Sequence, residues 1–265
     1  MPEQTIFSLS AIVALVPSSL LPLRKDHSRD MIFWLVLAVA VAGPVNRVLA
    51  SMAGTWRTDL STTLWVTVAA TMSIFAFITI LTRETWRLTP LISAYMAVLG
   101  ILAAVWSQVP HEPLAAAWGG WIGVHIGVSV TTYALVTIAA VAALAAFLQE
   151  RALKRKRPTA LTRLLPSVAD CEWLLVRLLV LGEIVLALGL ATGMALQHGE
   201  TGMLLVLDHK TILTITTFVV IGGLLIAHFK TGLRGRKAAR IVLLAYLLLT
   251  LGYPGVKFVT DVILA

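Results

Sequence analysis

The sequence contains one cysteine, Cys171, and few charged residues. Asp, Glu, Lys and Arg make up 13% of its 265 residues and hydrophobic residues make up 58%, whereas about a quarter of the residues of an ordinary soluble domain are charged. A single cysteine cannot form an internal disulfide, and neither a C-x-x-C nor a C-x-x-C-H motif is present. The pattern therefore excludes dithiol chemistry by this chain alone and covalent attachment of haem.

Signals for cleavage and for soluble-enzyme chemistry are also missing. The first ten residues, MPEQTIFSLS, hold an acid and no Lys or Arg, and no A-x-A-like site ends the apolar stretch that follows. We therefore expect no removal of a secretory signal. The chain offers no nucleophile–base pair, phosphate-binding loop or pair of carboxylates where substrate and water meet, so we do not expect an enzyme in the ordinary sense.

Hydrophobic residues are gathered in blocks of about 20 residues, the length that crosses a bilayer. The sequence therefore predicts an all-α, polytopic membrane helix bundle with about eight transmembrane helices. We expect one integral membrane domain over residues 1–265, of which residues 1–107 hold the first four spans. The predicted spans are 4–23, 30–50, 60–81, 88–107, 121–148, 172–197, 209–229 and 239–264. Gly43-Pro44 predicts a kink in the second.

The net charge of +8 comes mainly from loops between these spans. The first, third, fifth and seventh loops hold most of the 21 Lys and Arg residues, and the fourth and sixth loops hold none. The positive-inside rule then predicts cytoplasmic odd-numbered loops, both termini outside, and a bacterial inner membrane. Because the charges are not on a soluble face, we expect the partner to be the lipid bilayer and no nucleic acid.

A basic run, Lys154–Arg157, follows the fifth span, and we expect the helix to continue through it towards Pro158. One interpretation is a topology anchor that also contacts anionic lipid head groups. The alternative is a docking site for a soluble partner.

Trp118, Trp121 and His125 are spaced three and four residues apart at the start of the fifth span, so they share one helix face. Ser129 and Thr132 extend this stripe into the span. Interfacial tryptophans are common membrane anchors, and a histidine one turn further in can simply bond a neighbouring helix. The same stripe would also suit a ligand site.

Four of the six histidines are expected near the outer face: His111, His125, His198 and His209. Imidazole is a good ligand for iron, copper and zinc, but no H-x-x-x-H or H-E-x-x-H spacing is present. A metal site would therefore combine several helices. His228 is predicted at the inner end of the seventh span, about 30 Å from the outer face, so His125 and His228 cannot share one iron.

Two further ionisable features lie within predicted spans. Glu183, near the middle of the sixth span, suits either a proton or cation site or a helix-to-helix hydrogen bond of a protonated carboxyl. Lys257 and Asp261, four residues apart in the last span, are expected to pair.

Three stretches carry a resemblance to a known family. They are VHIGVSVTTYALVTIAAVAAL (124–144), ATG (191–193), and the long segment that begins LDHKTILTITTFVV at residue 207 and includes AHFKTG. They resemble the cytochrome c assembly family of CcsA/CcmC-type haem-handling membrane proteins, and within it the HemX- and YpjD-like branch. Residues 117–265 form the family-like core.

The resemblance implies a set of cofactor-binding residues. His125 matches a family histidine that ligates haem on the outer side, and His228 matches one at the inner end of a span that helps to hold haem. Asp208 and Lys210 match the Asp-x-Lys that closes the family's tryptophan-rich segment. That segment is replaced here by MALQHGETGMLLVLDHKT, which has no aromatic residue. The family's second outer histidine, which follows the last span, has no counterpart in these residues. Trp118, Trp121, His198 or His209 are the candidate substitutes.

The leading hypothesis is a non-catalytic haem-binding protein of cytochrome c assembly or haem homeostasis. It would bind haem b non-covalently, with imidazole ligands from membrane helices, and act with other cytochrome c biogenesis or haem-synthesis proteins. The alternative is a regulatory or scaffolding subunit that docks a cytoplasmic partner through its basic loops. A transporter centred on Glu183 ranks below both, because no pair of broken helices repeats in two halves.

Overall fold

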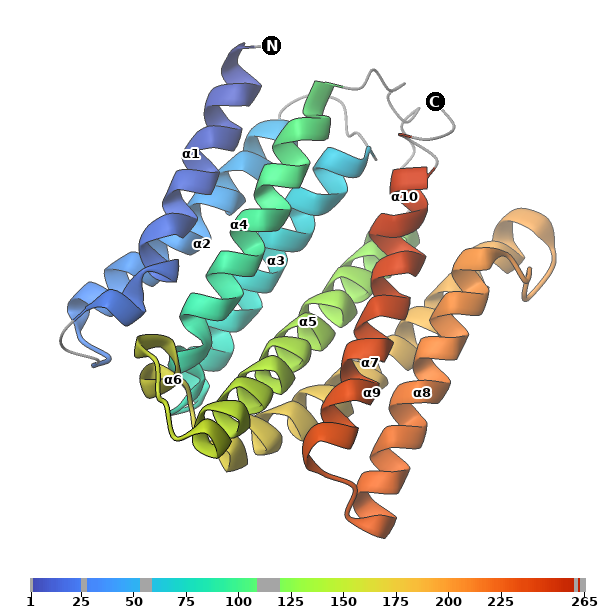
Figure 1. Cartoon of the computed structure of the whole chain (residues 1–265). Helices are drawn as coiled ribbons and strands as arrows, with labels where there is room; N and C mark the ends of the chain where they lie inside the picture. Colours follow the sequence, from blue (N-terminus) through green and yellow to red (C-terminus); the bar gives the residue numbers. More distant parts are fainter. Residues whose placement is uncertain (1, 25–27, 53–58, 109–119, 260–261, 263–265) are drawn as a thin grey trace. The chain divides into compact units, whose positions relative to one another are not determined.

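The computed structural model describes residues 2–24, 28–52, 59–108, 120–259 and 262, and all regular structure in these residues is helical (Figure 1). Eight helical segments of the described chain are long and apolar enough to cross a membrane. They are Thr5–Leu23, Met31–Ser51, Leu60–Leu81, Thr85–Val105, Trp121–Arg155, Val168–Gly199, His209–Thr231 and Gly235–Phe258. The predicted all-α class and the eight spans are therefore confirmed.

The largest extension beyond a predicted boundary is in α5 (Gly120–Arg155), which has 36 residues. No proline or glycine interrupts its second half, and Glu150 and Lys154 form an i,i+4 ion pair of 3.7 Å. The helix ends where Lys156 adopts a positive φ of 53°. The basic run thus begins within the helix, as the sequence predicts, and ends just before Pro158.

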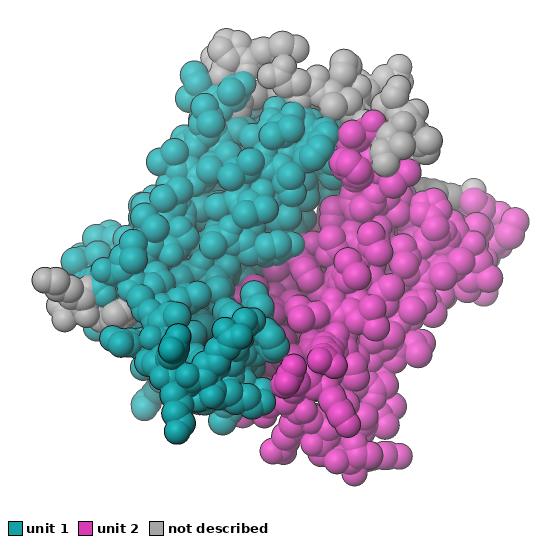
Figure 2. Space-filling view, in the orientation of Figure 1, with its two compact units in different colours: residues 1–114, 144–171 teal, residues 115–143, 172–265 magenta. Residues whose placement is uncertain are grey.

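The chain divides into two compact units (Figure 2). The first comprises residues 1–114 and 144–171. It contains α1 (Pro2–Ser19), α2 (Met31–Met52), α3 (Leu60–Leu81) and α4 (Thr89–Val105), together with the C-terminal part of α5 and the short α6 (Ala160–Leu164). Helix α2 is continuous through Pro44. It packs closely on α1, since a Cβ at Gly43 would lie 2.6 Å from Cβ of Ala14.

Polar side chains join the helices of the first unit. Arg47 is 5% exposed, and its Nε donates to Ser8 Oγ at 3.0 Å. Before α2, Asp30 pairs with Arg24 and accepts from the amide of Phe33 at 3.0 Å. The hydrogen bond from Arg24, followed by that from Phe33, holds the pKa of Asp30 well below its usual range. These bonds fix the start of the second span.

The second unit comprises residues 115–143 and 172–265. It contains the N-terminal part of α5, most of α7 (Val168–Thr201), α8 (His209–Thr231) and α9 (Gly235–Thr250). The last span continues through a π-helical turn, η4 (Leu251–Gly255), into α10 (Val256–Phe258). Pro254 lies in that turn and lacks the N–H that a regular α-helix would use. Turns of this type often occur at functional sites.

Local caps define the hairpin of α8 and α9. Asp208 accepts from the amide of Thr211 at 2.7 Å and begins α8, and Gly232, with φ of 67°, ends it. The amide of Gly235, at the start of α9, donates to Oε1 of Glu172 at 2.8 Å, which ties the hairpin to α7. The end of the last span is thereby brought back beside the start of α8.

Candidate ligand-binding site

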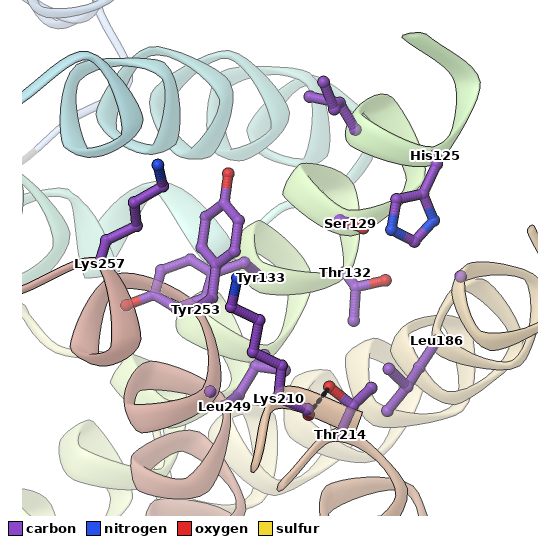
Figure 3. Close-up of a pocket in the computed structure, with 13 residues that line it drawn as sticks. His125, Ser129, Thr132, Tyr133, Leu186, Lys210, Thr214, Leu249, Tyr253 and Lys257 are labelled. Carbon is purple, nitrogen blue, oxygen red and sulfur yellow. Dashed lines mark hydrogen bonds between the residues drawn. The ribbon is translucent and has the colours of Figure 1, made fainter. Parts of the chain in front are cut away.

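A cavity of about 290 Å³ lies within the second unit (Figure 3). Four elements line it: α5, α7, the first turns of α8, and the end of the last span. Leu186 and Leu249 contribute apolar surface, and Tyr133 and Tyr253 contribute rings. The lining thus combines apolar and aromatic surface with a few polar groups, the composition typical of sites for small organic ligands.

The α5 wall follows from the sequence spacing. His125, Ser129, Thr132 and Tyr133 lie at positions i, i+4, i+7 and i+8, which fall on one face of a helix. All four line the cavity. The stripe predicted from His125 through Ser129 and Thr132 is therefore the face of α5 that borders this space.

The imidazole of His125 is held in place by α7. Its Nδ1 lies 3.0 Å from Thr192 Oγ1, and that hydroxyl is also 3.1 Å from the carbonyl oxygen of Gly189. When the hydroxyl donates to that carbonyl, it accepts from Nδ1–H of His125. In that tautomer Nε2 keeps its lone pair, which is the arrangement of a histidine ready to bind a metal.

Small residues of α7 make room for this ring. A Cβ at Gly193 would lie 3.1 Å from Cε1 of His125, and one at Gly189 would lie 3.5 Å from Val128 on the same α5 helix. Thr192 and Gly193 belong to the ATG segment of the sequence. That segment therefore forms the surface of α7 against which the imidazole packs.

A tyrosine cluster supports the side of the cavity away from α7. The hydroxyl of Tyr133 lies 3.0 Å from that of Tyr246 and 3.2 Å from Thr250 Oγ1, which links α5 to α9. The rings of Tyr133 and Tyr253 lie 6.1 Å apart. Two aromatic rings are thus fixed by hydrogen bonding and packing, one on each of two lining elements.

The charged groups of the lining have one sign. Lys210, the second residue of α8, and Lys257, near the end of the last span, both line the cavity. No Asp or Glu belongs to the described lining. Lys257 was expected to pair with Asp261, which lies outside the described residues. The charged side chains of the described lining are therefore both lysines.

The other predicted residues that the structure describes near this end do not line the cavity. Trp121 is 63% exposed, and Trp118 and His111 fall outside the described residues. His209 is exposed, as is Asp208, whose carboxylate caps α8. Partial burial acts to raise the pKa of Asp208, but the hydrogen bonds from Thr211 and the charges of His209 and Lys210 outweigh it and lower the pKa below 3.8.

His228 lies near the other end of α8 and does not line the cavity. Its Nδ1 donates to the carbonyl of Leu233 at 2.9 Å, and its ring meets the edge of Phe229. His228 lies 18 residues after Lys210, which corresponds to roughly 27 Å of helix. His125 and His228 are therefore not brought together. No cluster of three or more His, Cys, Asp or Glu residues occurs in the part of the chain that the structure describes.

Sequence reasoning did not identify four residues of the site: Thr192 as the partner of His125, Lys257 as a lining residue, and the two aromatic residues Tyr133 and Tyr253. A local signal existed for Tyr133, which continues the α5 stripe one residue past Thr132. Thr192 lies in the ATG segment that carries part of the resemblance, but nothing local indicated its partner His125, which is 67 residues away.

Comparison with known proteins places the chain in a family. The model of the "Cytochrome C assembly protein" family matches residues 27–264. The chain is 53% identical over the full length of both proteins to an "Uncharacterized 28.8 kDa protein in nifR3-like 5'region" of Azospirillum brasilense. It is 29% identical over 178 residues to "Inner membrane protein YpjD" of Escherichia coli K12, covering 67% of this chain and 66% of that protein.

No solved structure matches the chain at a significant level. The family match nevertheless covers most of the sequence, including every residue that lines the cavity. With eight helices suited to crossing a membrane in its described residues, the protein is a multi-pass protein of the inner membrane. The chain belongs to the cytochrome c assembly protein family.

Proposed function

We propose that this protein binds haem b non-covalently in the cavity beside His125 and handles it in cytochrome c assembly or haem homeostasis. The observation that carries the proposal is the position of His125, which lines the cavity and whose Nδ1 is engaged by Thr192. In the tautomer with the proton on Nδ1, Nε2 has a lone pair that can bind iron. The protein would bind and present haem to partner proteins and would not itself form thioether bonds.

The residues present fit this cofactor. Haem is a flat apolar ring with an iron that takes an axial imidazole and two carboxylates at one edge, and the bound iron would supply the site for axial ligation. His125 would provide the imidazole. Leu186, Leu249 and the rings of Tyr133 and Tyr253 would contact the macrocycle. The described lining contains one histidine, so His125 is the axial ligand that this cavity itself offers.

His228 is proposed as a second haem contact at a different depth. Its Nδ1 is bonded to the Leu233 carbonyl, so Nε2 again carries the lone pair. The roughly 27 Å of helix between it and the cavity means that it would act on a separate haem or at a separate stage. The outward residues Trp121 and His209 remain candidates to contact haem at the other end.

Absorption spectra of the purified protein test this proposal. The full chain, made in a haem-replete host and purified in mild detergent, should show a Soret band and sharp reduced α and β bands. His125→Ala and His228→Ala should each weaken one component. Thr231→Ala is the control, because Thr231 is an exposed residue near His228 whose hydroxyl donates to the backbone carbonyl of Ala227 at 2.7 Å. A folded, colourless protein that takes up no added haem would overturn the proposal.

A second candidate is a regulatory or scaffolding subunit that docks a cytoplasmic partner without binding haem. It is favoured by the exposed basic residues at the end of α5, Lys154–Arg157. Neutralising this run should abolish partner capture under this alternative while His125→Ala leaves it intact. Haem spectra that depend on His125, together with unchanged partner capture after neutralisation, would exclude it.

A further inference from the structure

A run of five large apolar residues occupies the loop that joins α7 to α8 (Figure 1). Met203, Leu204, Leu205, Val206 and Leu207 are all exposed, with between 37% and 67% of each residue accessible. Single exposed apolar residues are ordinary, but a contiguous apolar patch indicates an interaction surface. The segment is not helical, so it is not the lipid-facing side of a regular span. The patch therefore requires a partner at the depth where the loop lies.

Contacts between α5 and α7 determine the depth of the last turns of α7. A Cβ at Gly193 would meet His125, and a Cβ at Gly189, four residues earlier, would meet Val128, three residues after His125. The two helices therefore run antiparallel here. The turn of α7 that follows Gly193 is thus level with Trp121, which lies one turn before His125 on α5.

That level marks the membrane surface. Trp121 is the first residue of the fifth candidate span and is exposed, and tryptophans are enriched where spans meet the head groups. Gln197 lies in the turn after Gly193, and its Oε1 accepts from the amide of Val206 at 3.4 Å, which brings the loop back to this depth. Helix α7 continues four residues past Gln197, to Thr201, which adds roughly 6 Å. The head groups form a layer of roughly 5–7 Å on each side of the hydrocarbon core, so the loop lies within that layer.

The backbone of the loop excludes a position in the hydrocarbon core. Side chains of α7 accept hydrogen bonds from two of its amides, those of Met203 and Val206. The amides of Leu204, Leu205 and Leu207 have no hydrogen-bond partner among the described residues. The hydrocarbon core tolerates no such free amides, whereas water and head groups at its edge can bond them. The side chains therefore favour lipid, and the backbone favours the interface.

We propose that Met203–Leu207 is a membrane-immersed loop, whose apolar side chains insert between the head groups and the acyl chains of one leaflet. The partner of this surface is the lipid, as it is for interfacial segments that combine an apolar side with a polar anchor. The last turn of α7 provides that anchor through Gln197 and Thr201. Immersion of the loop does not depend on haem binding in the cavity.

Cysteine accessibility tests this position in phosphatidylcholine nanodiscs, where water reaches both faces of the protein. Leu204→Cys and Leu207→Cys are made separately in a full-length Cys171→Ala chain, which removes the one native thiol. Each variant reacts with a charged, water-soluble maleimide, and its rate is divided by the rate of the same chain in denaturant. The thiolate is the reacting form and is disfavoured away from water, so both loop thiols should react at least about tenfold more slowly than a thiol in water.

Arg157→Cys and Val219→Cys are the reference variants. Arg157 is exposed in the basic run at the end of α5, where a thiol should react as in water. Val219 is 64% exposed in the middle of α8, where a thiol should hardly react. Equal elution profiles and unfolding temperatures would show that all the variants are folded.

Nitroxide labels on the same four thiols measure the depth directly. Oxygen, which concentrates in lipid, and a water-soluble nickel chelate should both reach the labels at positions 204 and 207. Oxygen should dominate at position 219, and the chelate should dominate at position 157. Loop thiols that react as fast as the one at position 157, with labels reached mainly by the chelate, would place the loop in water, accessible to a soluble protein, and overturn the proposal. Labels reached by oxygen alone, or by neither reagent, would also overturn it, because the loop would then lie in the core or under other parts of the protein.

Discussion

The imidazole of His125 on α5 lies directly against Gly193 on α7, so that a Cβ added to Gly193 would stand 3.1 Å from Cε1 of the ring. A real Cβ at this distance would be tighter than most Cβ contacts in proteins. The ring cannot easily retreat, because its Nδ1 is bonded to Thr192 on the same turn of α7. Two adjacent residues of α7 thus fix the position of the ring.

Replacing Gly193 with valine should displace the ring and weaken haem binding by at least tenfold. The branched side chain would occupy the space that Cε1 now fills, and packed regions accommodate such insertions poorly. Haem titration of the purified variant measures the effect. Gly199→Val is the control, because a Cβ at Gly199, six residues further along α7, meets nothing within 4 Å. Equal losses of haem affinity in the two variants would contradict the inference that Gly193 leaves the space in which the ring packs.

Removing the hydroxyl of Thr192 should weaken haem binding by about 10- to 100-fold, the usual effect of losing the partner of a metal-binding histidine. Valine keeps the shape but leaves Nδ1–H of His125 without an acceptor and no longer selects one tautomer. Thr192→Ser, which keeps the hydroxyl, should restore most of the affinity. If valine and serine behave alike, the hydroxyl is not what orients the ring.

The sequence predicted the helices that form this site, but it did not predict the contacts between side chains of different helices. Span length and loop charge located eight helices, and helical spacing put His125, Ser129 and Thr132 on one face that indeed borders the cavity. These properties depend on neighbours within a few residues. The Thr192 partner and the Lys257 side of the cavity depend on how α5, α7 and α10 pack, which no local pattern encodes. Lys257 was also interpreted through its nearest acid, Asp261, because i,i+4 spacing is visible and a cavity is not.

The position of Glu183 within its span was likewise consistent with two roles, a proton or cation site and a helix-to-helix hydrogen bond. Its Oε1 would lie 3.0 Å from a Cβ at Gly222 of α8, while a Cβ at the adjacent Gly223 would meet nothing within 4 Å. The carboxyl therefore lies against α8 at a position where a glycine leaves space for it.

Alanine at these two glycines should accordingly have different effects. Both substitutions gain the same helix propensity, roughly 0.5–1 kcal/mol. Gly222→Ala should lose about 1 kcal/mol relative to Gly223→Ala through crowding against Glu183. Unfolding temperatures in detergent measure this, and the difference should vanish in a Glu183→Ala background. A difference that survives removal of Glu183 would mean that some other neighbour causes it.

Asp208 should stabilise the protein through the first turn of α8, the turn that carries Lys210 to the cavity. Asp208→Ala removes the acceptor for the Thr211 amide and should cost about 0.5–2 kcal/mol of stability, whereas asparagine should retain most of the cap.

The stabilisation by Asp208 should also depend on pH. Because the pKa of Asp208 is lowered on folding, the stability that comes from its charge is fully present above the ordinary value of 3.8 and is lost as the pH falls below it. Unfolding temperatures of the native and Asp208→Asn proteins between pH 7 and pH 3 should therefore converge at the acid end. Parallel pH profiles would show that the carboxylate acts only as a hydrogen-bond acceptor.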